Sequence, residues 1–253
     1  MTELAFGGWI LLAFAALIVG LSKAALPGGN TVAVAIFAAI LPAKQSTATL
    51  LVLLIVGDIF ALWAYRQHAD WRTLGRLAPA VVAGLVLGAV FLVVADDAWV
   101  RRSIGVILLL LIAVTLWRRH VARRASTTAG PDGSSRPRWP AATAYGSLGG
   151  FTTMVANAGG PVMSMYFLAS GFRVMAFLGT AAWFFALVNI AKVPIMISLG
   201  LLTPATLLID LVLIPAVLVG AFVGRSIVRR IDQKTFERAI IVLTVVGALY
   251  LLV

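Results

Sequence analysis

Residues 79–88 read PAVVAGLVLG, and they recur 136 positions later (215 − 79) as PAVLVGAFVG at residues 215–224. Five of the ten positions are identical: the proline, the alanine, one valine and both glycines. The same offset pairs Asp96 with Asp232, and an offset of 131 (159 − 28) pairs Gly28-Gly29 with Gly159-Gly160. The chain therefore consists of two related halves with one short insertion in the second.

Composition indicates that lipid surrounds most of the chain. Hydrophobic residues make up 62% and charged residues 11% of the 253 residues, whereas a soluble domain averages about 45–50% apolar and about 25% charged. At about 20 apolar residues per crossing, the chain has room for roughly eight to ten transmembrane helices. The net charge is +11, but the arginines cluster between apolar segments, as in cytoplasmic loops. We expect a lipid bilayer and no nucleic acid as partner.

The longest polar stretch separates the two halves. Residues 118–140 contain six arginines around a centre rich in Ser, Thr, Gly and Pro, which is the composition of a linker. We expect a first transmembrane repeat at 1–117, a basic cytoplasmic linker at 118–140 and a second repeat at 141–253. A partner-binding role for the linker is the alternative to a solvated tether.

Each half contains five apolar segments, so the predicted fold is an all-α polytopic membrane protein. They lie at 5–26, 29–43, 46–64, 75–94 and 103–117, then at 141–157, 160–172, 177–198, 205–224 and 238–253. Equivalent loops carry opposite charge bias: loop 65–73 is basic while 199–204 is uncharged, and loop 225–237 is basic while 95–102 is balanced. This pattern predicts two inverted five-helix repeats, with the short second segments crossing and both termini outside. The alternative is that the short segments are re-entrant.

Both short segments follow a Gly-Gly break: Gly28-Gly29-Asn30 in the first half and Gly159-Gly160-Pro161 in the second. We expect Asn30 to be an N-cap and Pro161 to occupy a first helical position. A helix N-terminus presents unpaired N–H groups and a partial positive charge, which favour an anion. Inverted repeats would bring two such ends together near the midplane, so a binding site is predicted there. The alternative is that these glycines only allow close helix packing.

Ionisable residues within membrane spans are functional candidates. Lys192 is predicted to face an anionic substrate, and Asp58 is the candidate proton carrier; a structural Lys192–Asp58 pair is the alternative. Asn189 lies one helical turn before Lys192 and is the repeat mate of Asp58 (58 + 131 = 189). Lys23 is expected either to snorkel to an interface or to contact substrate. Asp210 lies in a later span.

Uncharged polar residues complete the predicted site. Thr49 and Thr180 are repeat mates (49 + 131 = 180), and Asn157 precedes the second break. Their hydroxyls and amides can coordinate a sulfonate or carboxylate, although Ser and Thr also bond back to their own helix. The GxxxG motifs at 84–88 and 220–224 predict close helix contacts, within the monomer or in a homodimer.

The sequence favours no enzyme class. It contains no G-x-S-x-G, H-E-x-x-H or Walker A motif and no cysteine, so hydrolase, zinc-protease and nucleotide-binding sites are not expected. The two histidines, His68 and His120, lie in separate basic loops. We expect no metal site and no cofactor. The N-terminus lacks the positive region of a signal peptide, so the first apolar run is expected to stay in the mature protein.

In the order and spacing of its short motifs, the chain resembles the TauE/SafE family of sulfite exporters. The resemblance rests on the two Gly-Gly breaks, on KQSTAT at 44–49 leading to Tyr65 and to DWR at 70–72, and on AGGP at 158–161 leading through Gly179-Thr180 to Gly200. The first half departs from the family in having only two glycines between Pro27 and Asn30.

The resemblance implies transport of sulfite, a sulfonate or a related small anion. Together with the repeats, it predicts a secondary transporter in the cell inner membrane that works by alternating access, with the proton as candidate coupling ion. The alternatives are a passive anion channel, since filters also use broken backbone, and a structural membrane scaffold, against which the broken helices argue.

Overall fold

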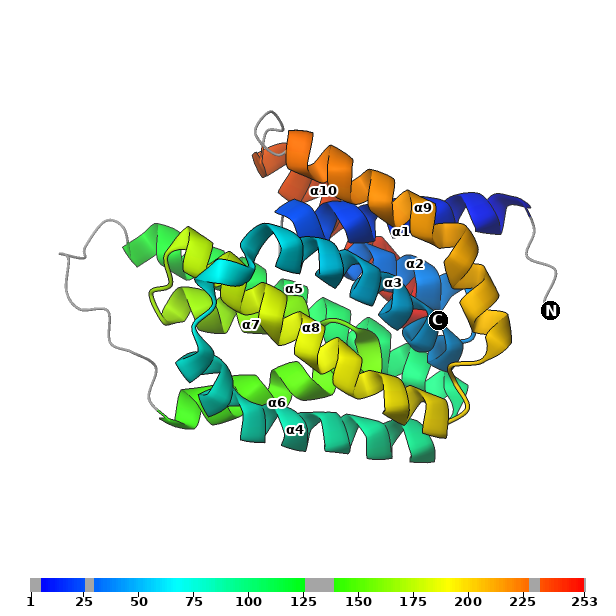
Figure 1. The fold of residues 1–253 in the computed structure, drawn as a ribbon, viewed down its shortest axis with the longest axis horizontal. Helices are drawn as coiled ribbons and strands as arrows, with labels where there is room; N and C mark the ends of the chain where they lie inside the picture. The colour runs from blue at the N-terminus through cyan, green and yellow to red at the C-terminus, as the bar shows by residue number, and fades with distance from the viewer. Residues whose placement is uncertain (1–5, 26–29, 126–138, 228–232, 253) are drawn as a thin grey trace.

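The computed structural model describes residues 6–25, 30–125, 139–227 and 233–252. Within these ranges the chain is helical and contains no strand. The helices are α1 (Phe6–Ala25), α2 (Thr31–Ile40), α3 (Ala43–Tyr65), the 3-10 turn η1 (Arg66–His68), α4 (Trp71–Val94), α5 (Asp97–Ala125), α6 (Trp139–Ala156), α7 (Gly159–Ala169), α8 (Val174–Ser198), α9 (Pro204–Ile227) and α10 (Gln233–Leu252). The ten α-helices correspond one to one with the ten predicted apolar segments, which confirms the all-α polytopic fold (Figure 1).

Six of these helices are long and apolar enough to cross a membrane: α1, α3, α4, α5, α8 and α9. By contrast, α2 has 10 residues and α7 has 11. At about 1.5 Å per residue, each is roughly 15 Å long, half the thickness of a bilayer core. Neither short helix can span a bilayer alone.

Backbone contact at glycines joins the two halves. In α4 and α6, a Cβ added at Gly84 would lie 2.1 Å from the Ser147 carbonyl oxygen. In α1 and α9, a Cβ added at Gly220 would lie 2.1 Å from the Leu17 carbonyl oxygen. Gly84 and Gly220 are repeat mates, so the same contact is made twice, each time between one helix of each half. The GxxxG glycines therefore pack within the monomer, which confirms the first of the two predicted uses.

Equivalent loops of the two halves lie at opposite ends of the bundle (Figure 1). The start of α8 packs on η1, since a Cβ at Gly179 would lie 2.7 Å from backbone atoms of His68 and Tyr65. The loop that follows α8, at 199–203, begins 20 residues (199 − 179) beyond this contact along the helix, or about 30 Å. Loops 65–73 and 199–204 were predicted to lie on opposite sides of the membrane, and their positions fit that topology. The inversion of the halves relative to a bilayer stays a prediction.

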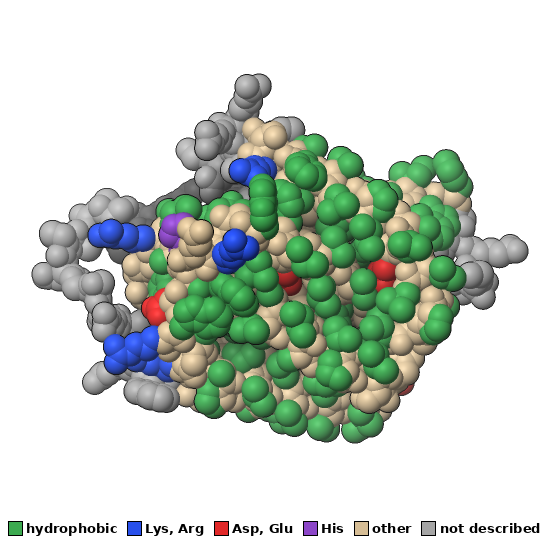
Figure 2. All heavy atoms as spheres, viewed as in Figure 1, with side chains coloured by type: hydrophobic (Ala, Val, Ile, Leu, Met, Phe, Trp, Pro, Cys, Tyr) green, Lys and Arg blue, Asp and Glu red, His purple; other side chains and the backbone are tan. Residues whose placement is uncertain are grey.

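The surface matches a lipid environment. Figure 2 shows hydrophobic side chains covering most of one face, with basic side chains gathered at the end near η1. Exposed tryptophans lie near helix ends: Trp63, Trp71, Trp99 and Trp117 are 55–65% exposed. Tryptophan at these positions is typical of a membrane interface.

Candidate functional site

A cavity of about 60 Å³ lies between α1, α3, α8 and the break that joins α6 to α7. A single water needs roughly 10–15 Å³ of such space, so the cavity has room for a small ion. Part of its wall is polar, and the remainder is apolar. The lining residues are Ser22, Lys23, Asn30, Leu54, Asp58, Ala61, Tyr65, Thr153, Asn157, Gly160, Leu178, Ala181, Ala182, Phe185 and Asn189.

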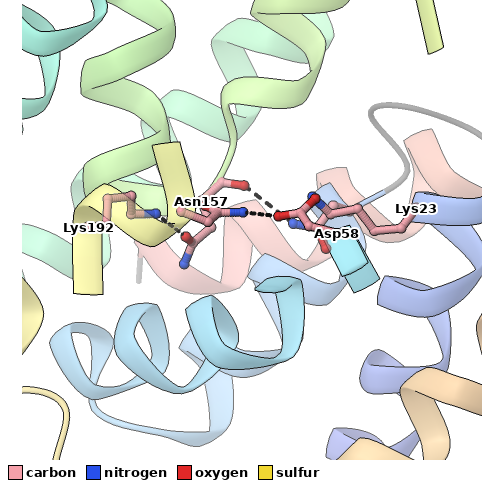
Figure 3. Close-up of polar contacts among 6 residues, drawn as sticks. Lys23, Asp58, Asn157 and Lys192 are labelled. Atoms are coloured by element: carbon pink, nitrogen blue, oxygen red, sulfur yellow. Dashed lines mark hydrogen bonds and ion pairs between the residues drawn. The ribbon is translucent and has the colours of Figure 1, made fainter. Parts of the chain in front are cut away.

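An ion pair between Lys23 and Asp58 occupies the polar wall (Figure 3). The Asp58 side chain is 2% exposed, and its second carboxylate oxygen accepts a 2.6 Å hydrogen bond from Asn189 Nδ2. The Lys23 ammonium also lies 4.8 Å from the centre of the Phe185 ring. Lys23 therefore does not snorkel to an interface but lines the cavity, because its partner Asp58 lies inside the protein.

Lys192 has different partners from those predicted. It is completely buried, and its ammonium donates to the Thr153 carbonyl at 2.7 Å and to Asn157 Oδ1 at 2.5 Å (Figure 3). These groups lie at the C-terminal end of α6, where a positive charge stabilises unpaired carbonyls. Lys192 does not line the cavity, and the alternative of a Lys192–Asp58 pair is wrong, since Asp58 pairs with Lys23.

Asn157 stabilises the second break, between α6 and α7. This residue has a positive φ of 50°, a left-handed conformation that Asn tolerates better than most residues and that ends helices. Its Nδ2 donates to the Thr47 carbonyl at 2.8 Å, and Thr47 Oγ1 in turn donates to the Val155 carbonyl at 3.0 Å. The break is thereby fixed to α3 on one side and to Lys192 on the other.

The two capping predictions need correction. Asn30 stands at the N-cap position of α2 but makes no capping bond; its Nδ2 donates to the Asn157 carbonyl at 3.3 Å instead. Its backbone is already helical (φ −67°, ψ −14°), whereas a capping side chain needs the extended conformation. Pro161 is the third residue of α7 rather than the first. Proline is accepted there because no N–H of the first turn has an intrahelical partner.

The structure brings together only part of the predicted site. Asn30, Asp58, Asn157, Gly160 and Asn189 line the cavity, while Thr49, Gly159, Pro161, Thr180 and Lys192 do not. Gly28 and Gly29 lie outside the described residues.

Thr49 and Thr180 lie outside the cavity lining. The Thr180 hydroxyl accepts a 2.9 Å hydrogen bond from the Asp70 backbone N–H at the start of α4. Thr49 is fully buried, and its hydroxyl has no hydrogen-bond partner among the described residues.

Sequence reasoning missed Ser22, Thr153, Tyr65 and Phe185, and it left Lys23 undecided. A signal for two of them was present, since Ser22 and Thr153 are polar repeat mates (22 + 131 = 153). No local signal marks Phe185, because any aromatic residue in an apolar helix is more often core.

The charges around the cavity favour an anion. Lys23 and Asp58 carry opposite charges in the wall, and Lys192 lies outside the lining but bonds to Thr153 and Asn157, which are part of it. The N-terminal turn of α7 adds a partial positive charge where Gly160 lines the wall. The described residues hold no group of three or more His, Cys, Asp or Glu that could hold a metal ion.

The model of the sulfite exporter TauE/SafE family matches residues 12–251, nearly the whole chain. The chain belongs to the TauE/SafE family. The resemblance read from the motifs is therefore confirmed, and the chain is a multi-pass membrane protein of a family of sulfite exporters. No curated protein and no solved structure matches the chain. Within this TauE/SafE protein, the cavity between the two halves is the place where the geometry favours an anion.

Proposed function

We propose that the protein is a secondary transporter of a small sulfur-containing anion across the cell inner membrane, with the basic linker on the cytoplasmic side. The observation that carries the proposal is a lysine only 13% exposed, Lys23, in a cavity bordered by a helix break. A charged group at this depth is costly unless it has a function or a partner. Lys23 has an intramolecular partner in Asp58, and an anionic substrate would compete for the same ammonium.

Exchange of partners at Lys23 would couple the anion to a proton. When Asp58 is ionised, it neutralises Lys23 and opposes a second anion. Protonation of Asp58 removes that competitor and leaves the ammonium for the substrate, so one proton and one anion bind together. Asn189 remains bonded to the carboxyl in either state by rotating its amide, which offers both a donor and an acceptor.

Two unpaired hydrogen-bond acceptors in the cavity wall limit the choice of substrate further. Asn30 Oδ1 and Asn189 Oδ1 are buried and have no hydrogen-bond partner among the described residues, and both residues line the cavity. Leaving such an acceptor unpaired costs about 1–3 kcal/mol. A substrate that carries hydrogen-bond donors, such as hydrogensulfite or the ammonium-bearing taurine, therefore fits better than sulfoacetate.

Alternating access follows from the way in which the helices pack. The α1–α9 and α4–α6 pairs are joined by backbone contact at glycines and are expected to move as rigid units. The cavity lies between them, at the break that Asn157 holds. Movement of one pair against the other would open the cavity to one side of the membrane at a time.

The test is counterflow of radiolabelled sulfite in liposomes that contain the purified protein. Unlabelled sulfite inside should drive transient accumulation of label, and Lys23→Gln should abolish it. Lys44→Gln is the matched control, because Lys44 lies at the start of α3 and does not line the cavity. A passive channel would instead carry sulfite current without accumulation of label.

A thermal-shift screen with sulfite, sulfoacetate, taurine, thiosulfate and arenesulfonates would identify the substrate. A ligand that binds only the folded state raises its stability by mass action. Stabilisation by none of these anions, together with no counterflow, would refute the proposed function.

A further inference from the structure

A second buried carboxylate lies outside the cavity. Asp210 in α9 is 1% exposed, and neither of its carboxylate oxygens has a hydrogen-bond partner among the described residues. An ionised carboxylate buried without a partner costs several kcal/mol, so such a group binds a proton or a cation. Asp58 is different, because Lys23 and Asn189 bond to its two oxygens.

No neighbouring helix supplies a charge to Asp210. Helix α9 packs against α1 and α3. The ionisable side chains of these helices are Lys23 in α1 and Lys44, Asp58 and Tyr65 in α3. The ion pair found among the described residues joins Lys23 to Asp58 and leaves Asp210 out. Residues 26–29, which follow α1, contain no ionisable side chain.

A second unpaired polar group lies on a helix that packs against α9. Helices α3 and α9 run in the same direction, since Phe60 meets Phe222 with ring centres 5.4 Å apart and Trp63 meets Arg225 at 5.0 Å. Asp210 precedes Phe222 by twelve residues and Thr49 precedes Phe60 by eleven. Counted along the chain from this contact, the two residues differ by one position, and Pro215 lies inside α9 between Asp210 and Phe222.

The Thr49 hydroxyl is fully buried and unpaired, whereas that of its repeat mate Thr180 accepts from the Asp70 backbone. The second-half threonine therefore has a structural use that the first-half threonine lacks. Thr49 and Asp210 lie on helices that pack against each other, and a hydroxyl can accept the one hydrogen bond that a protonated carboxylic acid donates.

We propose that Asp210 is a second proton-binding site of this protein, separate from the substrate cavity, with Thr49 as the hydrogen-bond acceptor of the protonated acid. Proton uptake converts the carboxylate to a neutral acid, and release restores the charge. Neither residue lines the cavity. Three side-chain oxygens are fewer than hard cations take, so the proton is the better occupant. Proton binding stands independently of the proposed transport function; only its part in coupling rests on that function.

Infrared spectroscopy of the purified protein tests proton binding without a substrate. The wild type should show a carbonyl stretch of a buried protonated carboxylic acid, and Asp210→Asn should lose it. Asp96→Asn, the same change at an exposed carboxylate, should retain it. An Asp210→Asn protein with an unchanged band, or a wild type without one, overturns the proposal. A band that disappears when sodium is added would assign the site to a cation instead and also overturn it.

Thr49→Val tests whether Thr49 accepts the hydrogen bond of protonated Asp210. It also tests the proposal if Asp210→Asn does not fold. Loss of the accepting hydroxyl should shift the acid band to higher frequency. Thr115→Val is the control, because that hydroxyl bonds to its own helix at the Leu111 carbonyl and its loss should leave the band unmoved. An unshifted band in folded Thr49→Val refutes the assignment of Thr49.

Proton flux in liposomes tests the role in coupling. With sulfite as the probe, Asp210→Asn should lower the number of protons moved per sulfite by one while sulfite binding stays at the wild-type level. An unchanged proton count overturns the coupling role of Asp210. Absence of sulfite flux in the wild type would refute the proposed function instead, and the infrared result would still decide whether Asp210 binds a proton.

Discussion

Asn189 donates a 2.6 Å hydrogen bond to Asp58, and these two residues occupy equivalent positions 131 residues apart in the two halves. Repeat mates that touch would lie near the axis of the predicted inverted repeat. Two carboxylates at such a point would repel each other and could not both ionise. An amide opposite a carboxylate avoids that repulsion and leaves a single negative charge to neutralise Lys23.

Asp58→Asn should tighten sulfite binding, because it removes the competitor for the Lys23 ammonium. A charge-assisted hydrogen bond is worth about 1.5–3 kcal/mol, so roughly a ten- to hundredfold gain is expected in calorimetry. The same variant should lose uphill transport driven by a proton gradient but retain downhill exchange. Uphill transport at the wild-type rate would show that Asp58 is not part of the coupling.

Substitutions of Lys23 and Lys192 should have different effects on binding and on stability. Lys23→Met should abolish sulfite binding; it also leaves the buried Asp58 without its cation, which costs stability unless the carboxylate binds a proton, while Asn189 still bonds to it. Lys192→Met should mainly destabilise the protein, because the Thr153 carbonyl and Asn157 Oδ1 lose their donor; leaving buried polar groups unpaired costs about 1–3 kcal/mol each. Thermal unfolding measures the stability of both variants, and calorimetry measures their affinity for sulfite. A stable Lys192→Met protein that cannot bind sulfite would place Lys192 in the site after all.

Gly220→Ala should strongly destabilise the protein, because the new Cβ would lie 2.1 Å from the Leu17 carbonyl oxygen and separate α9 from α1. Gly75→Ala is the matched control in α4, where nothing lies within 4 Å of the added atom. There the change should be neutral or stabilise by about 0.5–1 kcal/mol, the usual gain from removing glycine in a helix. Equal melting temperatures in detergent for the two variants would mean that this contact is not rigid.

Asn157→Ala should destabilise the protein more than Asn157→Gly. Both variants lose the bonds to Thr47 and Lys192, but only alanine keeps a Cβ at a φ of 50°. The left-handed conformation costs a non-glycine residue about 1–2 kcal/mol, so the two free energies of unfolding should differ by that order. The reverse order would show that the break relaxes when the side chain is removed.

His68→Cys and Gly200→Cys should react with an impermeant thiol reagent from opposite sides of the membrane. The two positions lie in equivalent loops at opposite ends of the bundle, and the native chain contains no cysteine that would add background labelling. Labelling of both positions from the same side would refute the inverted topology.

The sequence alone determined the helical architecture. Ten apolar segments, two of them short, became ten helices with ends within eight residues of those expected, because a backbone in lipid must satisfy its polar groups within each helix. The repeat of PAVVAGLVLG likewise identified the glycines at which the halves touch. These features depend on local composition and spacing, which the sequence states directly.

Only the tertiary structure decided which polar groups meet. Asp58 pairs with Lys23, 35 residues away, and Lys192 bonds to the end of α6 rather than to Asp58. Repeat offsets put Asp58 and Asn189 in equivalent places, but the partner of each charge depends on how every helix is rotated about its axis. That rotation is set by many small packing contacts across both halves, such as those of Gly84 and Gly220, and no single segment of the sequence contains them.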